Sequence, residues 1–174
     1  MAKRILIYTN HYFPEQFKIN EIVDWLSEKE YHIRVITGLP NYPSGKVYKG
    51  YYPLNRKASL DNKDTIVNRL FLIPRGSGSS LMLSLNYLSY FVSCLIFTIY
   101  ILIFKKKYDF IFVHHTSPIF IAVHPMIYST FRRTRKFLWD LDLWPETLNA
   151  MGIIKSKKLL KIIELFVKKI YATY

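Results

Sequence analysis

Residues 4–9 read R-I-L-I-Y-T and residues 32–37 read H-I-R-V-I-T, two short apolar runs that are rich in β-branched side chains. Runs of this kind are typical of strands buried on both faces of a sheet. Between them, Pro14 can open a helix, and four apolar residues recur at helical spacing: Ile19, Ile22, Val23 and Leu26. The order strand, helix, strand predicts a βαβ unit, whose two strands run parallel in one sheet.

The same alternation continues along the chain. Further strands are predicted over residues 65–73, 109–113 and 136–141, and helices over residues 81–104, 119–131 and 155–171. We therefore expect a single α/β domain over residues 1–174, built as a Rossmann-like, doubly wound and mostly parallel sheet. Ligands bind at the carboxyl ends of the strands in such sheets, so the functional loops are expected at residues 10–15, 38–53, 74–78, 114–118 and 142–146.

The composition is both apolar and basic. Of the 174 residues, 51% are hydrophobic, and 25 Lys and Arg against 12 Asp and Glu give a formal net charge of +13. This apolar content excludes a disordered chain, and the single cysteine, Cys94, excludes a disulfide scaffold or a cysteine-based metal cluster. The basic surplus lies mainly in residues 65–174. It indicates an anionic partner: a membrane surface, a nucleic acid or a phosphorylated substrate.

The sequence favours some of these partners over others. Nucleic acid is disfavoured, because no recognition motif is present and the aromatic residues lie in apolar runs that resemble core. The apolar run near the N-terminus is too short for a secretion signal, so we expect a cytoplasmic protein. An anionic membrane surface at the inner face of the cell membrane and a phosphorylated substrate remain as the favoured partners.

One long segment has no charge at all. Residues 76–104 contain no charged side chain, and three lysines follow them at 105–107. The stretch 81–104 is long enough to cross a bilayer with the lysines on the cytoplasmic side. Alternatively, this helix packs on the sheet or lies in the membrane interface, which is favoured because a spanning helix would separate the strands on either side of it. The basic segment 155–171 would add attraction to anionic lipid.

Common phosphate and metal motifs are weak or missing. A dinucleotide fingerprint needs G-x-G-x-x-G after the first strand, whereas the first glycine is Gly38, and no G-x-x-x-x-G-K-S/T loop is present. Asp140 and Asp142 could bind a divalent metal as a pair, but Pro145 ends the strand soon after them. The simpler interpretation places Asp140 at a strand end and Asp142 in a loop, so no metal is expected.

Histidines and carboxylates stand at the predicted strand and helix ends. His114 and His115 close a strand, where an imidazole can hydrogen-bond a sugar hydroxyl or phosphate, or shuttle a proton, but can equally be structural. His124, inside the next helix, is expected to be structural. Glu15 and Glu146 lie near helix starts, where each either favours the helix dipole or orients an acceptor hydroxyl.

A series of motifs runs in order along the chain: Y-F-P-E at 12–15, I-N-E at 19–21, T-G-L-P-N-Y-P-S-G-K at 37–46, L-I-P-R-G at 72–76, N-Y-L-S-Y-F at 86–91, T-S-P at 116–118 and L-D-L-W-P-E-T-L at 141–148. In these motifs the sequence resembles the N-terminal domain of family-4 glycosyltransferases of the GT-B fold. The resemblance is strongest to the WbuB-like group that transfers sugars in lipopolysaccharide or capsule synthesis. The stretches 38–46 and 142–146 are its most specific part.

The resemblance implies retaining transfer of a sugar from a nucleotide diphosphate donor to a sugar on a polyprenyl diphosphate, at the cytoplasmic membrane face and without metal or another cofactor. The N-terminal domain of such enzymes receives the acceptor. The family's strand-end histidine matches His114, and we expect catalytic roles for His114, His115 and Asp142. The substrate-binding residues expected from the matching motifs are Tyr12, Glu15, Asn41, Tyr42, Arg75, Ser117 and Glu146.

The family's second domain, which binds the nucleotide sugar, has no counterpart in residues 1–174. We therefore expect these residues to be the acceptor-side half of a glycosyltransferase, truncated, split or paired with a donor-binding chain, and inactive alone. The rival hypothesis is a non-catalytic, membrane-associated protein, either a decayed fragment or a subunit that recruits a partner.

Overall fold

The structure, a computed structural model, describes residues 3–53, 65–150 and 156–174. Its strands are β1 (Arg4–Thr9), β2 (His32–Gly38), β3 (Thr65–Leu70), β4 (Phe110–His115) and β5 (Arg135–Asp140). Its helices are α1 (Ile19–Glu28), α2 (Ser80–Phe104), the 3-10 helix η1 (Ile119–Ala122), α3 (Val123–Arg132), α4 (Glu146–Ala150) and α5 (Lys157–Tyr171). All the predicted strands are present, whereas the short helix α4 was not predicted.

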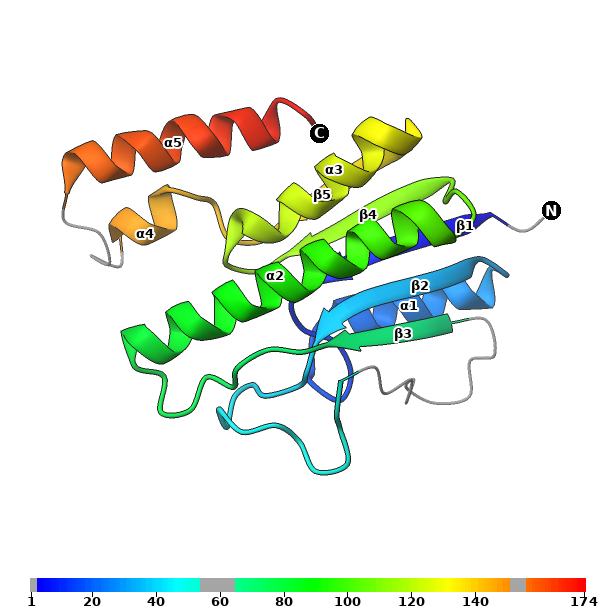
Figure 1. The fold of residues 1–174 in the computed structure, drawn as a ribbon, viewed down its shortest axis with the longest axis horizontal. Coiled ribbons are helices and arrows are strands. Elements are labelled where there is room, and N and C mark those ends of the chain that lie inside the picture. The colour runs from blue at the N-terminus through cyan, green and yellow to red at the C-terminus, as the bar shows by residue number, and fades with distance from the viewer. Residues whose placement is uncertain (1–2, 54–64, 151–155) are drawn as a thin grey trace.

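The strands form one sheet in the order β3-β2-β1-β4-β5, and each neighbouring pair is parallel (Figure 1). The chain moves outward from β1 through β2 to β3, then returns across β1 to β4, so the strand order reverses beside β1. Such a reversal is where doubly wound α/β folds bind ligands. The predicted Rossmann-like architecture is therefore confirmed.

Helices cover both faces of this sheet (Figure 1). On one face, α1 buries Ile19 and Val23 against β1, β2 and β3. On the other, α2 and α3 bury Tyr90 and Tyr128 against β1 and β4. α4 and α5 extend this second layer by packing on η1. Because successive strand residues point to opposite faces, the apolar run of β1 contributes to both cores.

The first helix starts later than expected. α1 begins at Ile19 and not at Pro14, because the Asn20 side chain holds the preceding residues in a turn. Its Oδ1 accepts from the N–H of Phe13 at 3.0 Å, and its Nδ2 donates to the carbonyl of Glu15 at 2.8 Å. The segment between β1 and α1 is therefore a fixed loop at the carboxyl edge of the sheet.

The other boundary differences are small. The single helix predicted over 119–131 is a 3-10 turn, η1, followed by α3, and β3 ends at Leu70 instead of residue 73. α5 begins after Ser156, whose hydroxyl caps the helix by accepting from the N–H of Leu159. None of these differences changes which edge of the sheet the loops occupy.

α2 lies along the sheet and buries one stripe of its surface: Asn86, Tyr90, Cys94, Thr98 and Ile101. The strands before and after it, β3 and β4, belong to the same sheet, as the sheet-packed interpretation requires. By length and composition α2 could nevertheless cross a membrane, and only 22% of its most apolar 18-residue window is buried. Much of the outward side of α2 is therefore an apolar surface that the described chain leaves uncovered.

Candidate functional site

The loops after β1, β4 and β5 are tied together at the carboxyl edge of the sheet. The Asn10 amide donates to the carbonyl oxygens of Thr116 and Ser117. The N–H of Ser117 donates to Asp142 Oδ2 at 2.8 Å, and Trp144 Nε1 donates to Ser117 Oγ at 2.9 Å. Ser117 and Asp142 are thus brought into contact, and the Asp142 carboxylate fixes the backbone of the loop after β4.

Glu15 joins the loop after β1 to the loop after β2. Its side chain is buried, and Oε1 accepts from the N–H groups of Asn41 at 2.8 Å and Tyr42 at 2.7 Å. Its other oxygen, Oε2, lies 2.8 Å from His11 Nδ1. Since α1 starts four residues later, the helix-dipole explanation of Glu15 is wrong. Glu15 instead positions Asn41 and Tyr42.

His11 connects this carboxylate to Arg75, and no sequence pattern had singled it out. Arg75 Nη2 lies 3.1 Å from His11 Nε2. A guanidinium can only donate, so Nε2 is the acceptor and the imidazole proton lies on Nδ1, facing Glu15. The ring of Phe17 stacks on the imidazole with 4.6 Å between the centroids. His11 is therefore held in one ring orientation between Glu15 and Arg75.

The Arg75 guanidinium lies near two aromatic rings. Its central carbon is 5.4 Å from the centroid of Tyr42 and 5.6 Å from that of Tyr87, and its backbone N–H donates to Asn41 Oδ1 at 3.2 Å. Among the described residues no carboxylate forms an ion pair with it. An oriented guanidinium without a counter-ion is suited to bind a phosphate or carboxylate.

His114 is fully buried at the end of β4. Its Nδ1 lies 2.9 Å from Thr9 Oγ1, and the Thr9 hydroxyl donates to the carbonyl of His11 at 2.8 Å. Because that hydroxyl has only one proton, Nδ1 of His114 is the donor to Thr9, which leaves a lone pair on Nε2. Burial, together with His11 and His115, lowers the pKa of His114 to about 4. At pH 7 it is a neutral hydrogen-bond acceptor.

This lowered pKa makes the stability of the domain depend on pH. The folded pKa of His114, about 4, lies below the unfolded value of about 6.5. The unfolded chain therefore binds the proton more readily between these values, and stability is lost as the pH falls from about 6.5 towards 4. Burial also lowers the pKa of His124, which acts in the same direction.

Between pH 7 and pH 5, His114 is expected to account for about 2 kcal/mol of lost unfolding free energy. The variant His114→Asn, which keeps a donor for Thr9, should lose about 2 kcal/mol less than wild type over this range. Urea unfolding at both pH values measures this. His32→Asn, at an exposed position of β2, is the control and should show the full loss. The same loss in His114→Asn as in wild type would contradict the assignment.

His115 points to the opposite face of the sheet from His114. Its Nδ1 lies 2.6 Å from Asp140 Oδ1, across the β4–β5 pairing, and the Tyr171 hydroxyl donates to Asp140 Oδ2. Burial, followed by the Asp140 contact, raises the pKa of Tyr171, so this phenol stays a donor. An aspartate bound to Nδ1 fixes the orientation of the imidazole ring.

A metal site receives no support from the carboxylates. The residues that the structure describes contain no group of three or more His, Cys, Asp or Glu side chains that could hold a metal ion. Asp140 ends β5 and Asp142 lies in the loop after it, as the simpler interpretation predicts. Each of these carboxylates accepts hydrogen bonds from within the chain.

Two of the singled-out residues, Glu146 and His124, lie outside this network, whereas the carbonyl of Tyr12 accepts from the N–H of Glu15 at 3.2 Å. Tyr12 is 2% exposed and belongs to the core beneath α1. Glu146 lies in the first turn of α4, where it lines a cavity against α5 with Lys161 and Glu164. His124 is buried between the carbonyls of α2 and η1 that it contacts, as expected for a structural histidine.

Buried polar atoms without a partner gather at this edge. Among the described residues they include Asn10 Oδ1, Arg75 Nε, His114 Nε2, His115 Nε2 and Thr116 Oγ1. Leaving such an atom unpaired costs about 1–3 kcal/mol, so each of them marks a place for a bound water or a polar ligand atom. They include both donors and acceptors.

No protein-family model and no curated protein matches this chain. Its chemistry is therefore inferred from the geometry of the carboxyl edge and from the motifs that meet there.

Proposed function

We propose that residues 1–174 form the acceptor-side domain of a retaining glycosyltransferase of the GT-B fold. Such an enzyme moves a sugar from a nucleotide diphosphate to a lipid-linked glycan in O-antigen or capsule synthesis. The observation that carries the proposal is the convergence of the motifs. Stretches 12–15, 37–46 and 72–76 are linked by hydrogen bonds at one sheet edge, and so are stretches 116–118 and 141–148; Asn10 joins the two groups through Thr37 and Ser117.

Arg75 is the group that would bind the acceptor diphosphate. Its guanidinium is oriented by His11, lies near Tyr42 and Tyr87, and has no carboxylate partner among the described residues. Charge-assisted bonds from a guanidinium to phosphate oxygens are strong and directional. Tyr42, which is 43% exposed, offers an aromatic surface beside that charge for a sugar ring or a prenyl chain.

The transfer itself breaks the bond between the anomeric carbon of the donor sugar and the diphosphate oxygen. The same carbon forms a bond to the acceptor hydroxyl oxygen, the hydroxyl proton is released, and the nucleotide diphosphate leaves with the electron pair. His114 Nε2 would accept a hydrogen bond from a hydroxyl of the sugar. With a pKa of about 4, it is a poor proton acceptor at pH 7, so we assign it to positioning the sugar.

Acceptor binding tests this function. The probe is a short-chain prenyl-diphosphate-linked N-acetylhexosamine, titrated into the full 174-residue chain. Arg75→Gln is expected to raise the Kd about tenfold, the loss of one charge-assisted contact. Arg135→Gln, the same change at an exposed position of β5, should stay within about twofold of wild type. Equal affinities for wild type and Arg75→Gln would contradict the proposal, and no binding by wild type would favour the non-catalytic rival.

The proposal also places the domain on the inner face of the cell membrane, with α2 in the interface. The outward side of α2 exposes large apolar side chains, among them Leu88, Ile96, Ile103 and Phe104. Lysines 105–107 follow directly, and the basic residues around β5 and on α5 add positive charge. An apolar helix face beside cations is the pattern of a protein that lies on an anionic membrane.

An alkaline carbonate wash of cell membranes checks this placement. The chain is expected in the membrane pellet before the wash and in the supernatant after it, because an interfacial helix is released when the surface attraction is removed. An integral membrane protein from the same cells is the control and should stay in the pellet. Retention of the chain with that control would instead support a spanning α2.

A further inference from the structure

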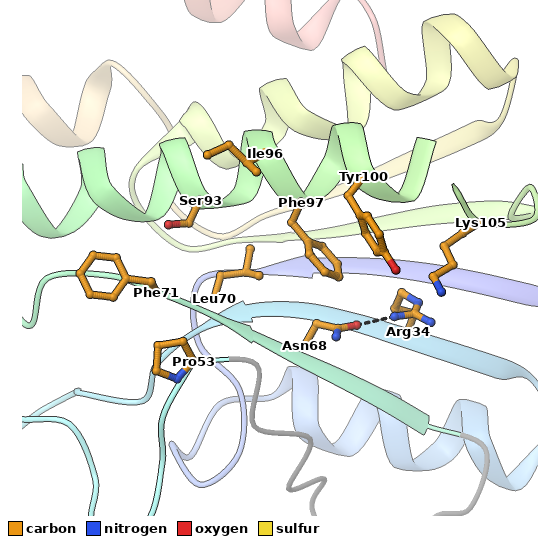
Figure 2. A pocket seen from close by; sticks show the side chains of 10 residues that line it. All are labelled: Arg34, Pro53, Asn68, Leu70, Phe71, Ser93, Ile96, Phe97, Tyr100 and Lys105. Carbon is orange, nitrogen blue, oxygen red and sulfur yellow. Dashed lines mark hydrogen bonds between the residues drawn. The ribbon is translucent and has the colours of Figure 1, made fainter. Parts of the chain in front are cut away.

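A cavity lies between α2 and the strands β2 and β3, and it runs from Leu70 and Phe71, at the carboxyl end of β3, to Arg34 and Lys105. Its volume is about 590 Å³. Figure 2 shows α2 along one side, through Ser93, Ile96, Phe97 and Tyr100, and the strands along the other. At one end of the groove stand Arg34 and Lys105, and at the other stands Phe71 (Figure 2).

The long part of this groove is apolar. Leu70 ends β3, and Phe97 faces it from α2 (Figure 2). Two further lining residues are strongly exposed, since Phe71 is 52% and Ile96 65% accessible. Exposed apolar area costs about 25 cal/mol per Å², so these walls favour a hydrocarbon occupant over water.

The other end of the groove carries positive charge in a fixed position. Arg34 Nε donates to the Tyr108 hydroxyl at 2.6 Å, and its Nη1 donates to Asn68 Oδ1 at 2.5 Å. Lys105 lies with its ammonium 5.5 Å from the ring centroid of Tyr100. Among the described residues neither cation forms an ion pair, and no carboxylate lines the groove. Two cations without a carboxylate partner among the described residues, at one end of an apolar groove, suit an anion attached to a hydrocarbon chain.

We propose that this groove binds one anionic phospholipid, with its phosphate at Arg34 and Lys105 and an acyl chain along Leu70, Phe71 and Phe97. The apolar wall argues against a free phosphate, and the paired cations argue against a neutral lipid. The groove continues into the exposed apolar side of α2 through Ile96 and Tyr100, so a lipid can enter it from a membrane surface. The site uses none of the residues assigned above to acceptor binding, so lipid binding is tested independently of sugar transfer.

The test compares soluble short-chain lipids by titration calorimetry. Dioctanoyl phosphatidylglycerol is expected to bind the full chain at least about tenfold more tightly than dioctanoyl phosphatidylcholine, because a choline cation would face the two basic residues. Inorganic phosphate is expected not to compete at millimolar concentration. Equal binding of the two lipids, or displacement by phosphate alone, would overturn the proposal.

Three variants localise the binding. Lys105→Gln is expected to weaken phosphatidylglycerol binding about tenfold. The matched control is Lys106→Gln, the same charge change at the next residue, which is exposed and does not line the groove, and it should stay within about twofold. Ser93→Trp fills the groove and should abolish binding. Equal effects of the two lysine variants, or full binding by Ser93→Trp, would place the lipid elsewhere.

Discussion

Replacing Glu15 with alanine is expected to lower the free energy of unfolding by about 4 kcal/mol, because each buried donor that loses its acceptor costs about 1–3 kcal/mol. The carboxylate accepts from the N–H groups of Asn41 and Tyr42 and lies against His11 Nδ1. Alanine would leave the donors of His11 and Asn41 buried without this acceptor, and that of Tyr42 partly buried. Urea unfolding at pH 7.5 measures the loss.

Two further variants sharpen this prediction. Glu21→Ala removes an exposed carboxylate that lies 2.9 Å from Lys18 on α1, and it should cost less than about 1 kcal/mol. Glu15→Gln keeps one oxygen for the two backbone donors but opposes an amide N–H to His11, so its loss should fall between the other two. If the Glu15→Ala and Glu21→Ala variants had equal free energies of unfolding, the Glu15 carboxylate would not hold the two loops together.

Local patterns predicted the elements well because the signals for them are local. The apolar run that becomes β1 was placed with its observed bounds, since side chains buried on both faces leave a continuous apolar stretch. The start of α1 was misplaced, because it depends on the side chain of Asn20 folding back onto Phe13 and Glu15. The spacing of apolar residues, from which the helix was predicted, carries no information about such a contact.

The position of the candidate site also followed from the sequence, through the rule that parallel strands present ligands at their carboxyl ends. The contacts between side chains within the candidate site could not be predicted from the sequence. The contact of Glu15 with Asn41 joins residues that are 26 positions apart, and Arg75 reaches His11 from 64 positions away. The neighbours His11 and Tyr12 show most clearly what the sequence leaves undetermined. The His11 side chain contacts Glu15 at the candidate site, whereas the Tyr12 side chain packs in the core.

The interpretation of α2 depended on topology more than on composition. Its uncharged sequence satisfied the length rule for a membrane span, but the strands on either side of it pair into one sheet with β1 and β2 between them. Asn86 and Thr98, two polar residues within this apolar run, are buried on the sheet side. Asn86 and Thr98 therefore mark the face of α2 that packs on protein.

The second large effect is expected at the contact between the loops after β2 and β3. Gly45 has a φ of +74°, and its carbonyl accepts from the N–H of Gly76 at 2.9 Å. A Cβ at Gly45 would lie 1.9 Å from the backbone oxygen of Gly76. Gly45→Ala is therefore expected to lower the free energy of unfolding by about 3 kcal/mol, from left-handed strain and from separation of the two loops.

Gly78 supplies the matched comparison. Its φ of +77° is nearly the same, but a Cβ there meets nothing within 4 Å, so Gly78→Ala should cost only about 1 kcal/mol for the left-handed backbone. The difference between the two variants isolates the loop contact, which holds Asn41 and Tyr42 beside Arg75. Gly45→Ala should therefore also weaken binding of the prenyl-diphosphate probe, whereas Gly78→Ala should not. Equal losses of stability in the two variants would mean that the loops move apart without cost and that Arg75 is positioned by other contacts.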